Sequence, residues 1–298
     1  MKKSELPCLG DVIDELSARF EQADLFFGHG TDNAWDEAVY LVFSALKIAF
    51  ESSEEIMSRP VTRAEQAQIE GLVQRRIQER VPVAYLVGEA WFAGLPFAVS
   101  SEVLVPRSPI AELIQQRFAT LVPRDPRSVL DLCTGSGCIG IAIALAFPQA
   151  RVDMSDVSAG ALALARVNIE RYGLQDRVMA LHSDLFADLT GPYDLIVTNP
   201  PYVSQEEVDA LPTEYHHEPT LGLVSADDGL AIPLQILRQA AQWLAPDGVL
   251  ILEVGYSREA LSARLPQVPF AWLEFAHGGE GVCMLTCQQL LDCRGQFT

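Results

Sequence analysis

The chain has 298 residues, 49% of them hydrophobic, which is enough for about two domains with sizeable cores. Its 40 acidic residues against 21 Lys and Arg give a net charge of −19. Such a surface repels a phosphate backbone, so we expect a basic protein as the partner and no direct nucleic-acid binding. The longest apolar run, residues 138–147, is too short to cross a bilayer, so no membrane association is expected.

The six cysteines form no CxxC pair, which argues against a zinc site. A chain of this size does not need disulfides, so the cysteines favour reduced thiols and a cytoplasmic location. Residues 1–5 also lack the apolar run of a signal peptide. His216 and His217 stand beside Glu214 and Glu218, but adjacent side chains rarely point to one centre, so no metal site is predicted.

The first part of the chain has the apolar spacing of amphipathic helices. Residues 11–27 and 35–50 each carry apolar side chains on one helical face. A third helix follows Pro60, where Thr62 and Glu65 form the pattern of a capping box. Residues 1–80 are therefore expected to form a small helical domain, which we take to recognise the substrate.

Residues 81–110 are expected to link this domain to a second one. The aromatic-rich runs on either side of Gly94 predict a β-hairpin over residues 91–97. A further short strand is expected at 103–105. Arg107 follows that strand directly and is a candidate for the site, although a solvated arginine is the commoner arrangement.

From Ser128 onward, apolar strands alternate with helical patterns, which predicts an α/β domain with a doubly wound parallel sheet over residues 111–298. No helix separates the last two predicted strands, so they should form an antiparallel pair at the sheet edge. The expected strands are 129–132, 152–155, 178–182, 195–198, 249–253, 272–275 and 282–286, and the expected helices are 139–147, 159–172 and 230–244.

Asn199-Pro200-Pro201-Tyr202 follows the buried strand 195–198. Prolines cannot continue a ladder and hold the preceding residue extended, so Asn199 lies on stiff backbone at the carboxyl end of that strand. Ligands bind at this end of open α/β sheets. The Asn amide, the Pro200 carbonyl and the Tyr202 ring together suit a flat group that bears an NH2.

Residues 131–140 follow the first predicted strand and open the first helix. Gly135, Gly137 and Gly140 match the dinucleotide pattern G-x-G-x-x-G, and Asp156 ends the next strand, where an acid binds ribose hydroxyls. The pattern leaves two cofactors open, NAD and S-adenosylmethionine.

Three features favour S-adenosylmethionine. Asp131 stands before the glycines, where it would repel a pyrophosphate but suits the ammonium of a methionine moiety. The seventh predicted strand fits a methyltransferase sheet, and Asn199 begins a motif that suits an NH2 acceptor. Asp184 follows the third strand and is a candidate for the adenine amino group, with Leu185 against the ring, although a helix cap is the alternative for Asp184.

Together, these motifs resemble the class I S-adenosylmethionine-dependent methyltransferases that modify amide or amino nitrogens. More narrowly, the chain resembles the HemK-like protein-glutamine N5-methyltransferases, including Val105-Pro106-Arg107 and Glu218-Pro219. The resemblance implies a Rossmann-like seven-stranded sheet, and a substrate glutamine whose NH bonds are accepted by Asn199 and the Pro200 carbonyl, with Pro201 stiffening the loop and Tyr202 walling the amide. It implies a cofactor site formed by Asp131, Cys133, Thr134, Gly135, Ser136, Gly137, Asp156, Asp184, Leu185 and Asn199, with Cys133 in place of the family's usual glycine.

The family has a branch that methylates peptide chain release factors and a branch that methylates a glutamine of large-subunit ribosomal protein three. Residues 29–38, 89–94 and 106–112 resemble the second branch. The first usually carries Arg-Pro-Glu-Thr-Glu where this chain has Arg107-Ser108-Pro109-Ile110-Ala111. The resemblance therefore implies the ribosomal protein, free or in an assembling particle, as the substrate.

Four alternatives stay open, and one of them is an NAD oxidoreductase, which a cofactor-binding titration would distinguish. A release factor is the nearest alternative substrate. A nucleic-acid base N-methyltransferase uses a similar Asn-Pro-Pro-Tyr motif, although it would need a cationic groove and a flipped base. A ribosome-assembly module that binds cofactor without turnover is the non-enzymatic alternative.

Overall fold

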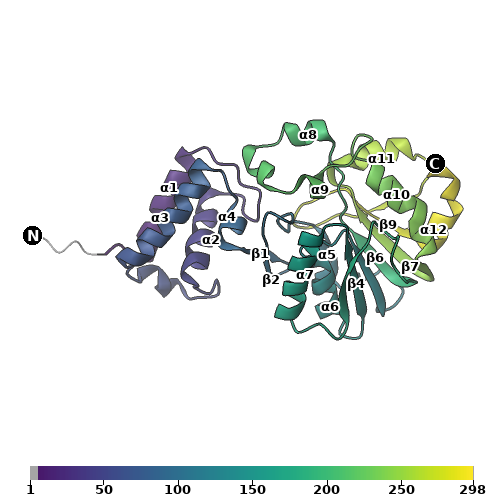
Figure 1. The fold of residues 1–298 in the computed structure, drawn as a ribbon, viewed down its shortest axis with the longest axis horizontal. Coiled ribbons are helices and arrows are strands. Elements are labelled where there is room, and N and C mark those ends of the chain that lie inside the picture. Colours follow the sequence, from purple (N-terminus) through teal and green to yellow (C-terminus); the bar gives the residue numbers. More distant parts are fainter. Residues whose placement is uncertain (1–5, 298) are drawn as a thin grey trace, which may run out of the picture. The chain divides into compact units, whose positions relative to one another are not determined.

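The computed structural model describes residues 6–297, so the first five residues, where no signal peptide was predicted, and Thr298 lie outside the described residues. The chain forms two compact units (Figure 1). The first runs to Ala90 and also contains Pro212–His217, and the second contains Trp91–Leu211 and everything from Glu218 onward. The predicted boundaries at 80 and 110, and the recognition role of residues 1–80, stay predictions.

The first unit is helical, and its helices begin and end at identifiable signals. Thr62 caps α3, because its hydroxyl accepts from the Glu65 amide at 3.3 Å and its own amide donates to the Glu65 carboxylate at 2.8 Å. This confirms the predicted capping box. The predicted helix over 35–50 ends earlier, since Lys47 takes a left-handed φ of 55°. The elements are α1 Leu9–Gln22, α2 Ala34–Leu46, η1 Glu54–Ser58, α3 Arg63–Gln78, α4 Val83–Val87 and η2 Thr213–His217.

A buried ion-pair network ties η2 to the helices of this unit. Arg76 of α3 is only 1% exposed and pairs with Glu37 of α2 and with Glu214 of η2. Its guanidinium also donates to the Phe26 carbonyl at 2.9 Å, while the Phe26 amide donates to Glu214 at 3.1 Å. Residues far apart in the sequence thus share one buried charge cluster.

The predicted hairpin is confirmed as β1 Glu89–Phe92 and β2 Leu95–Ala98. The strand expected at 103–105 is wrong, because no ladder forms there. Instead, the Val105 amide donates to the Glu218 carboxylate at 3.0 Å, and Pro106 has no amide to donate.

The second unit is built on a seven-stranded sheet of order β5-β4-β3-β6-β7-β9-β8. The strands from β5 to β7 are parallel, whereas β9 runs antiparallel to both β7 and β8, which confirms the predicted edge pair. The strands are β3 Ser128–Leu132, β4 Arg151–Asp156, β5 Val178–His182, β6 Tyr193–Thr198, β7 Leu244–Glu253, β8 Ala271–Trp272 and β9 Val282–Thr286.

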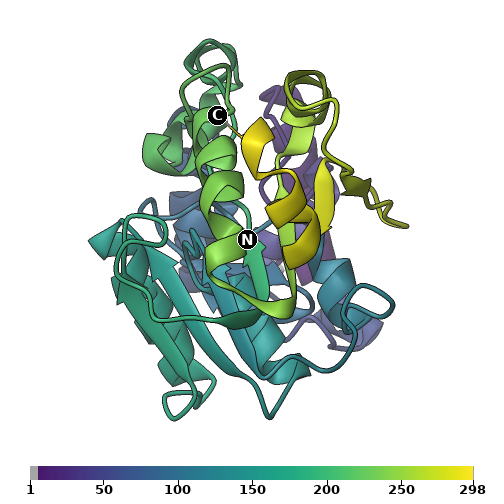
Figure 2. The same ribbon diagram turned by 90° about the vertical axis from the view of Figure 1, so that its right-hand side faces the viewer.

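Helices cover both faces of this sheet, as Figures 1 and 2 show. Alternate strand residues point to opposite faces. Val129 and Val197 join the core that packs under α5, α6 and α7, while Leu130 and Ile196 join the core under α10, α11 and α12. The remaining elements are α5 Ile110–Gln115, α6 Cys138–Ala146, α7 Ala159–Arg171, α8 Gln205–Asp209, α9 Thr220–Leu223, α10 Ala231–Gln239, η3 Ala240–Gln242, η4 Gly255–Ser257, α11 Arg258–Arg264, α12 Cys287–Asp292 and η5 Arg294–Gln296.

Two predicted elements differ at their ends. The helix expected over 230–244 stops at Gln239, and a short 3-10 turn follows it. Leu244 already belongs to β7, because it pairs with Tyr193 of β6. The strand expected over 272–275 is reduced to Ala271–Trp272.

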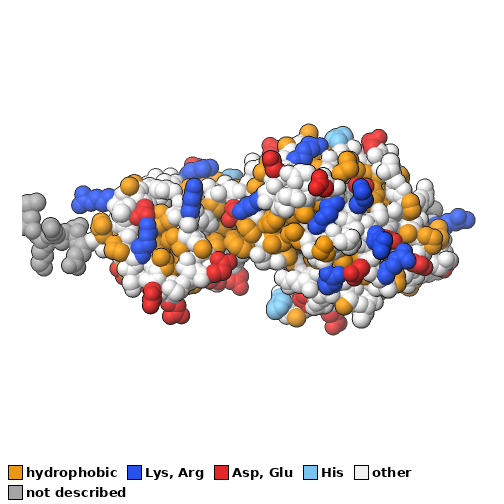
Figure 3. Space-filling view, turned by 90° about the horizontal axis from the view of Figure 1, so that it is seen from below, with side chains coloured by type: hydrophobic (Ala, Val, Ile, Leu, Met, Phe, Trp, Pro, Cys, Tyr) orange, Lys and Arg blue, Asp and Glu red, His pale blue; other side chains and the backbone are white. Residues whose placement is uncertain are grey.

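No helix within residues 6–297 is long and apolar enough to span a membrane. On the face drawn in Figure 3, Lys and Arg side chains lie interspersed with Asp and Glu rather than in one continuous patch.

Candidate active site

The candidate site lies at the carboxyl ends of neighbouring parallel strands in the second unit. Asp131 of β3 is in register with Val197 of β6 on one side and with Met154 of β4 on the other. Asp156 ends β4, and Asn199 directly follows β6. The sheet thus brings Asp131, Asp156 and the Asn199 motif together at the carboxyl ends of its central strands.

Asp131 is fully buried. Its Oδ2 accepts hydrogen bonds from the Thr134 hydroxyl and, at 2.8 Å, from the Gly140 amide at the start of α6. Its Oδ1 is buried and has no hydrogen-bond partner among the described residues. Burial raises the pKa of this carboxyl to about 7, against the two hydrogen bonds that lower it, and the nearby Asp156 carboxylate adds to the rise. A cationic ligand would satisfy the unpaired oxygen and restore the ionised form.

The loop after β3 turns through left-handed backbone. Cys133, Gly135 and Gly137 have φ values of 62°, 56° and 83°. Thr134 and Ser136 are buried within this turn. A Cβ at Gly135 would meet no atom within 4 Å, so the backbone at this residue borders open space. The loop therefore offers exposed backbone to a ligand beside a buried acid.

Gly140 is required for a different reason. A Cβ there would lie 2.6 Å from the Met154 sulfur and 2.9 Å from Asp131 Oδ2. Only a glycine lets α6 approach β4 this closely while its amide still reaches Asp131.

Asp156 is held by two backbone amides. Its Oδ2 accepts from the Gly135 amide at 2.9 Å, and its Oδ1 accepts from the Ser158 amide at 2.8 Å. Each oxygen keeps a second lone pair for another donor.

Asp184 is exposed, and no helix begins after it, so it is not the helix cap that the sequence left as an alternative. Leu185 is buried and has a left-handed φ of 49°.

The Asn199-Pro200-Pro201-Tyr202 segment is anchored at its last residue. The Tyr202 carbonyl accepts from the Ser257 hydroxyl at 2.8 Å, and a Cβ at Gly229 would lie 2.2 Å from that carbonyl oxygen. The Tyr202 ring lies against Gly255, where a Cβ would come within 2.7 Å of it. Asn199 itself is partly exposed. The motif is thus fixed by packing at Tyr202 while Asn199 stays partly exposed.

One acid in this region is not among the site residues predicted from the sequence. Glu253, the last residue of β7, is 4% exposed and accepts hydrogen bonds from Ser108 and Tyr202. Burial raises its pKa to about 7, against these two hydrogen bonds and nearby Arg107. A carboxylate at the end of the apolar run 249–252, beside the strand of Asn199, is the sequence signal that would have found it.

Arg107 is exposed, and its guanidinium donates two hydrogen bonds of 2.6 Å to the buried Glu218 carboxylate. This fork-to-fork pair joins the segment before α5 to the segment that follows η2. Arg107 therefore neutralises the buried Glu218 carboxylate and is at the same time exposed to solvent.

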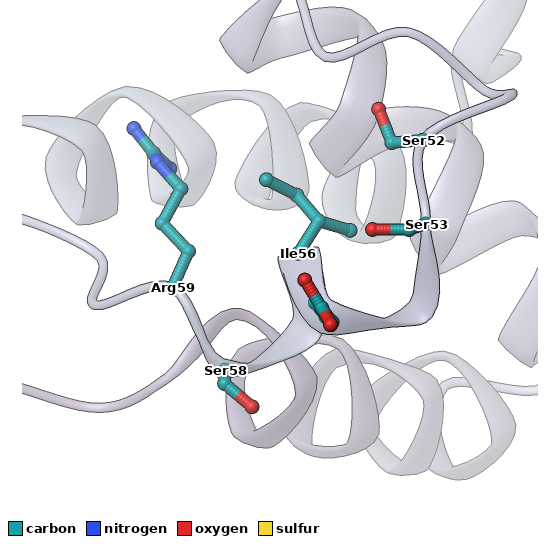
Figure 4. Close-up of a pocket in the computed structure, with 6 residues that line it drawn as sticks. Ser52, Ser53, Ile56, Ser58 and Arg59 are labelled. Carbon is teal, nitrogen blue, oxygen red and sulfur yellow. The ribbon is translucent and has the colours of Figure 1, made fainter.

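His216 and His217 belong to η2 in the first unit, and His217 Nε2 lies 2.8 Å from the Glu79 carbonyl oxygen. Within residues 6–297, no group of three or more His, Cys, Asp or Glu is placed to hold a metal ion. A surface depression in the first unit lies around η1 (Figure 4) and contains none of the predicted site residues. It is lined by Ser52, Ser53, Glu55, Ile56, Ser58 and Arg59.

Comparisons with known proteins agree with this geometry. Residues 112–214 match the family described as "Methyltransferase small domain". The hMettl16 catalytic domain, solved in complex with a MAT2A 3'UTR hairpin, aligns with a TM-score of 0.53 over 84% of this chain and 92% of that chain. At 15% sequence identity this likeness shows the fold alone.

Two curated relatives match almost from end to end. The "Ribosomal protein uL3 glutamine methyltransferase" of Neisseria gonorrhoeae is 46% identical over 96% of this chain and 97% of its own length. The protein of the same name from Neisseria meningitidis serogroup B is 44% identical over 96% of this chain and 95% of its own length. The seven-stranded sheet, the buried acid beside a glycine loop and this full-length identity lead to one conclusion: the chain belongs to the family of ribosomal protein uL3 glutamine methyltransferases.

Proposed function

We propose that this protein transfers a methyl group from S-adenosylmethionine to the side-chain nitrogen of a glutamine in ribosomal protein uL3. The observation that carries the proposal is the 46% identity over nearly the whole of both chains, because it covers both units of this protein. The net charge of −19 suits a basic ribosomal protein and opposes a phosphate backbone.

The residues at the carboxyl ends of the parallel strands fit S-adenosylmethionine. When bound, this cofactor supplies an electrophilic methyl group on a sulfonium. Asp131 would accept from its ammonium through the unpaired Oδ1, and Asp156 would accept from the ribose hydroxyls. The loop Cys133 to Gly137 would border the methionine moiety, and Asp184 and Leu185 would meet the adenine.

The glutamine amide needs orientation more than activation by a base. Its nitrogen is a poor nucleophile because the lone pair is delocalised into the carbonyl. Asn199 Oδ1 and the Pro200 carbonyl would accept its two N–H bonds, which fixes the amide plane and favours the positive charge that develops on nitrogen. Pro201 would stiffen the loop and Tyr202 would wall the site. The proton can leave after the transfer, so no dedicated base is required.

The test is methylation in vitro with labelled S-adenosylmethionine, followed by peptide mass spectrometry. The purified protein is offered unmethylated uL3 and, separately, an unmethylated peptide release factor. We expect label on a glutamine of uL3 alone. We expect Asn199→Ala to lose the transfer while it still binds the cofactor, as measured by calorimetry.

Other results would change the proposal in distinct ways. Label on the release factor would keep the chemistry and overturn the substrate. Label on neither protein, with normal cofactor binding, would favour an assembly module without turnover. Equal turnover by Asn199→Ala would remove the proposed role of the Asn199 motif.

A further inference from the structure

A buried carboxylate outside the proposed binding residues lies next to the Asn199 motif. In the sheet, Thr198 of β6 is in register with Leu252 of β7, so Asn199, which directly follows β6, comes next to the level of Glu253, the last residue of β7. Glu253 is 4% exposed. Burying a carboxyl group costs free energy of folding unless its oxygens accept hydrogen bonds. The hydrogen-bond partners of Glu253 therefore indicate what the buried acid does.

Both oxygens of Glu253 accept from hydroxyl groups. Oε2 accepts from the Ser108 hydroxyl, and Ser108, itself buried, also accepts from the Ile110 amide at 3.2 Å. Oε1 accepts from the Tyr202 hydroxyl at 3.4 Å, which is at the long limit for a hydrogen bond. An ionised carboxylate has only acceptors, so it holds both hydroxyls at once, whereas the protonated acid has to donate at one oxygen.

The backbone next to Glu253 is fixed by close contacts. The Val254 amide donates to the Gly281 carbonyl at 2.7 Å. A Cβ at Gly281 would lie 2.0 Å from the Gly255 carbonyl oxygen, and the Tyr202 ring lies against Gly255. The carboxylate is therefore a fixed point, and the Tyr202 side chain is placed relative to it.

We propose that Glu253 is a positioning residue of the methyl-transfer site: it holds the hydroxyl of Tyr202 and so fixes the wall beside Asn199. The inference rests on the proposed function. Glu253 touches neither substrate nor cofactor in this assignment and acts through Tyr202. Ser108 holds the carboxylate from the other side.

The groups that face Glu253 set its pH dependence. Ser108 and Tyr202 donate to it, and Arg107, whose charge is shared with Glu218, lowers its pKa from nearby. Burial outweighs these effects, so the carboxyl titrates near pH 7. The ionised form is the one that holds the hydroxyls of both Ser108 and Tyr202, so turnover at saturating substrates should rise as pH increases through this range.

The test compares kcat and pH profiles of the full-length enzyme on uL3. Glu253→Gln keeps the shape but loses one acceptor, and we expect kcat to fall about tenfold, the size of one hydrogen bond, with little change in cofactor affinity. In Glu253→Gln the increase of kcat with pH near pH 7 should be smaller than in the wild-type enzyme. In a Tyr202→Phe background the same substitution should have no further effect. Glu259→Gln is the matched control, because Glu259 is exposed on α11 of the same unit.

A second readout does not depend on turnover. Amide hydrogen exchange over residues 199–204 should be faster in Glu253→Gln than in Glu259→Gln. Unchanged exchange in Glu253→Gln would overturn the role proposed for Glu253, whether or not the wild-type enzyme methylates uL3. A wild-type enzyme that does not methylate uL3 would instead contradict the proposed function. Wild-type kcat in Glu253→Gln, or losses that simply add to those of Tyr202→Phe, would also overturn it.

Discussion

At the residue scale, the least ordinary group is Asp131. It is a fully buried acid with one oxygen unpaired among the described residues, and burial raises its pKa to about 7. A buried acid with no partner for one oxygen is unfavourable for folding. Its retention beside a glycine loop is explained if a cation of the cofactor supplies the missing partner.

This arrangement predicts a pH-dependent cofactor affinity. In the proposed assignment the ionised Asp131 binds the ammonium, so the dissociation constant for S-adenosylmethionine should fall as pH rises from 5.5 to 7, a range in which the ammonium keeps its proton. Below the pKa the change approaches about tenfold per pH unit. Asp131→Asn should weaken binding and remove most of this dependence. Calorimetric titrations across this range measure both effects. A wild-type affinity that does not change with pH would contradict the assignment.

At the element scale, η2 is the segment whose position the local sequence does not reveal. Its Glu214 is 2% exposed and accepts from Arg76 at 3.2 Å and from the Phe26 amide at 3.1 Å. The partners of this short turn are about 140 and 190 residues away in the chain. The turn is therefore held by long-range charge pairing and not by its own sequence.

We expect Glu214→Gln to destabilise the first unit. The substitution removes the charge that compensates the buried Arg76, although Glu37 remains, so we expect a loss of about 1–3 kcal/mol. Glu79→Gln is the matched control, because Glu79 is exposed and pairs with Arg75 four residues earlier on α3. That pair is worth under about 1 kcal/mol. Thermal unfolding measures the stability of both variants. Equal losses of stability would show that the buried ion pair contributes no more than the exposed one.

The elements predicted correctly are those that local patterns determine. The apolar runs of β3, β6 and β7 predict buried strands, and Thr62 with Glu65 predicts the start of α3. The strand expected at 103–105 failed because the Val105 amide is taken by Glu218, 113 residues away. Glu253 was not predicted as a site residue, because the local sequence shows it only as the end of a strand. Its hydrogen-bond partners come from other segments of the chain.

At the scale of the whole molecule, two buried acids affect stability together. Burial raises the pKa of both Asp131 and Glu253 to about 7, so the folded protein binds protons that the unfolded chain has released above about pH 4.5. Where the folded state binds more protons, the free energy of unfolding falls as pH rises.

We therefore expect the melting temperature to decrease between pH 5 and pH 7.5 in the absence of cofactor. The double variant Asp131→Asn with Glu253→Gln should show a smaller decrease, because the titrating groups are gone. Calorimetric melts of the two proteins across this range provide the measurement. A wild-type melting temperature that rises over the interval would contradict the two pKa shifts.

The division of the chain into units has a consequence for exchanging parts between relatives. The first unit is completed by Pro212–His217, so the polypeptide passes between the units at residues 90–91, 211–212 and 217–218. A chimaera cut once near residue 90 would give Arg76 a foreign η2 segment and separate it from Glu214. An exchange of the whole first unit would therefore require two segments to be replaced together, the N-terminal residues up to 90 and the six residues 212–217.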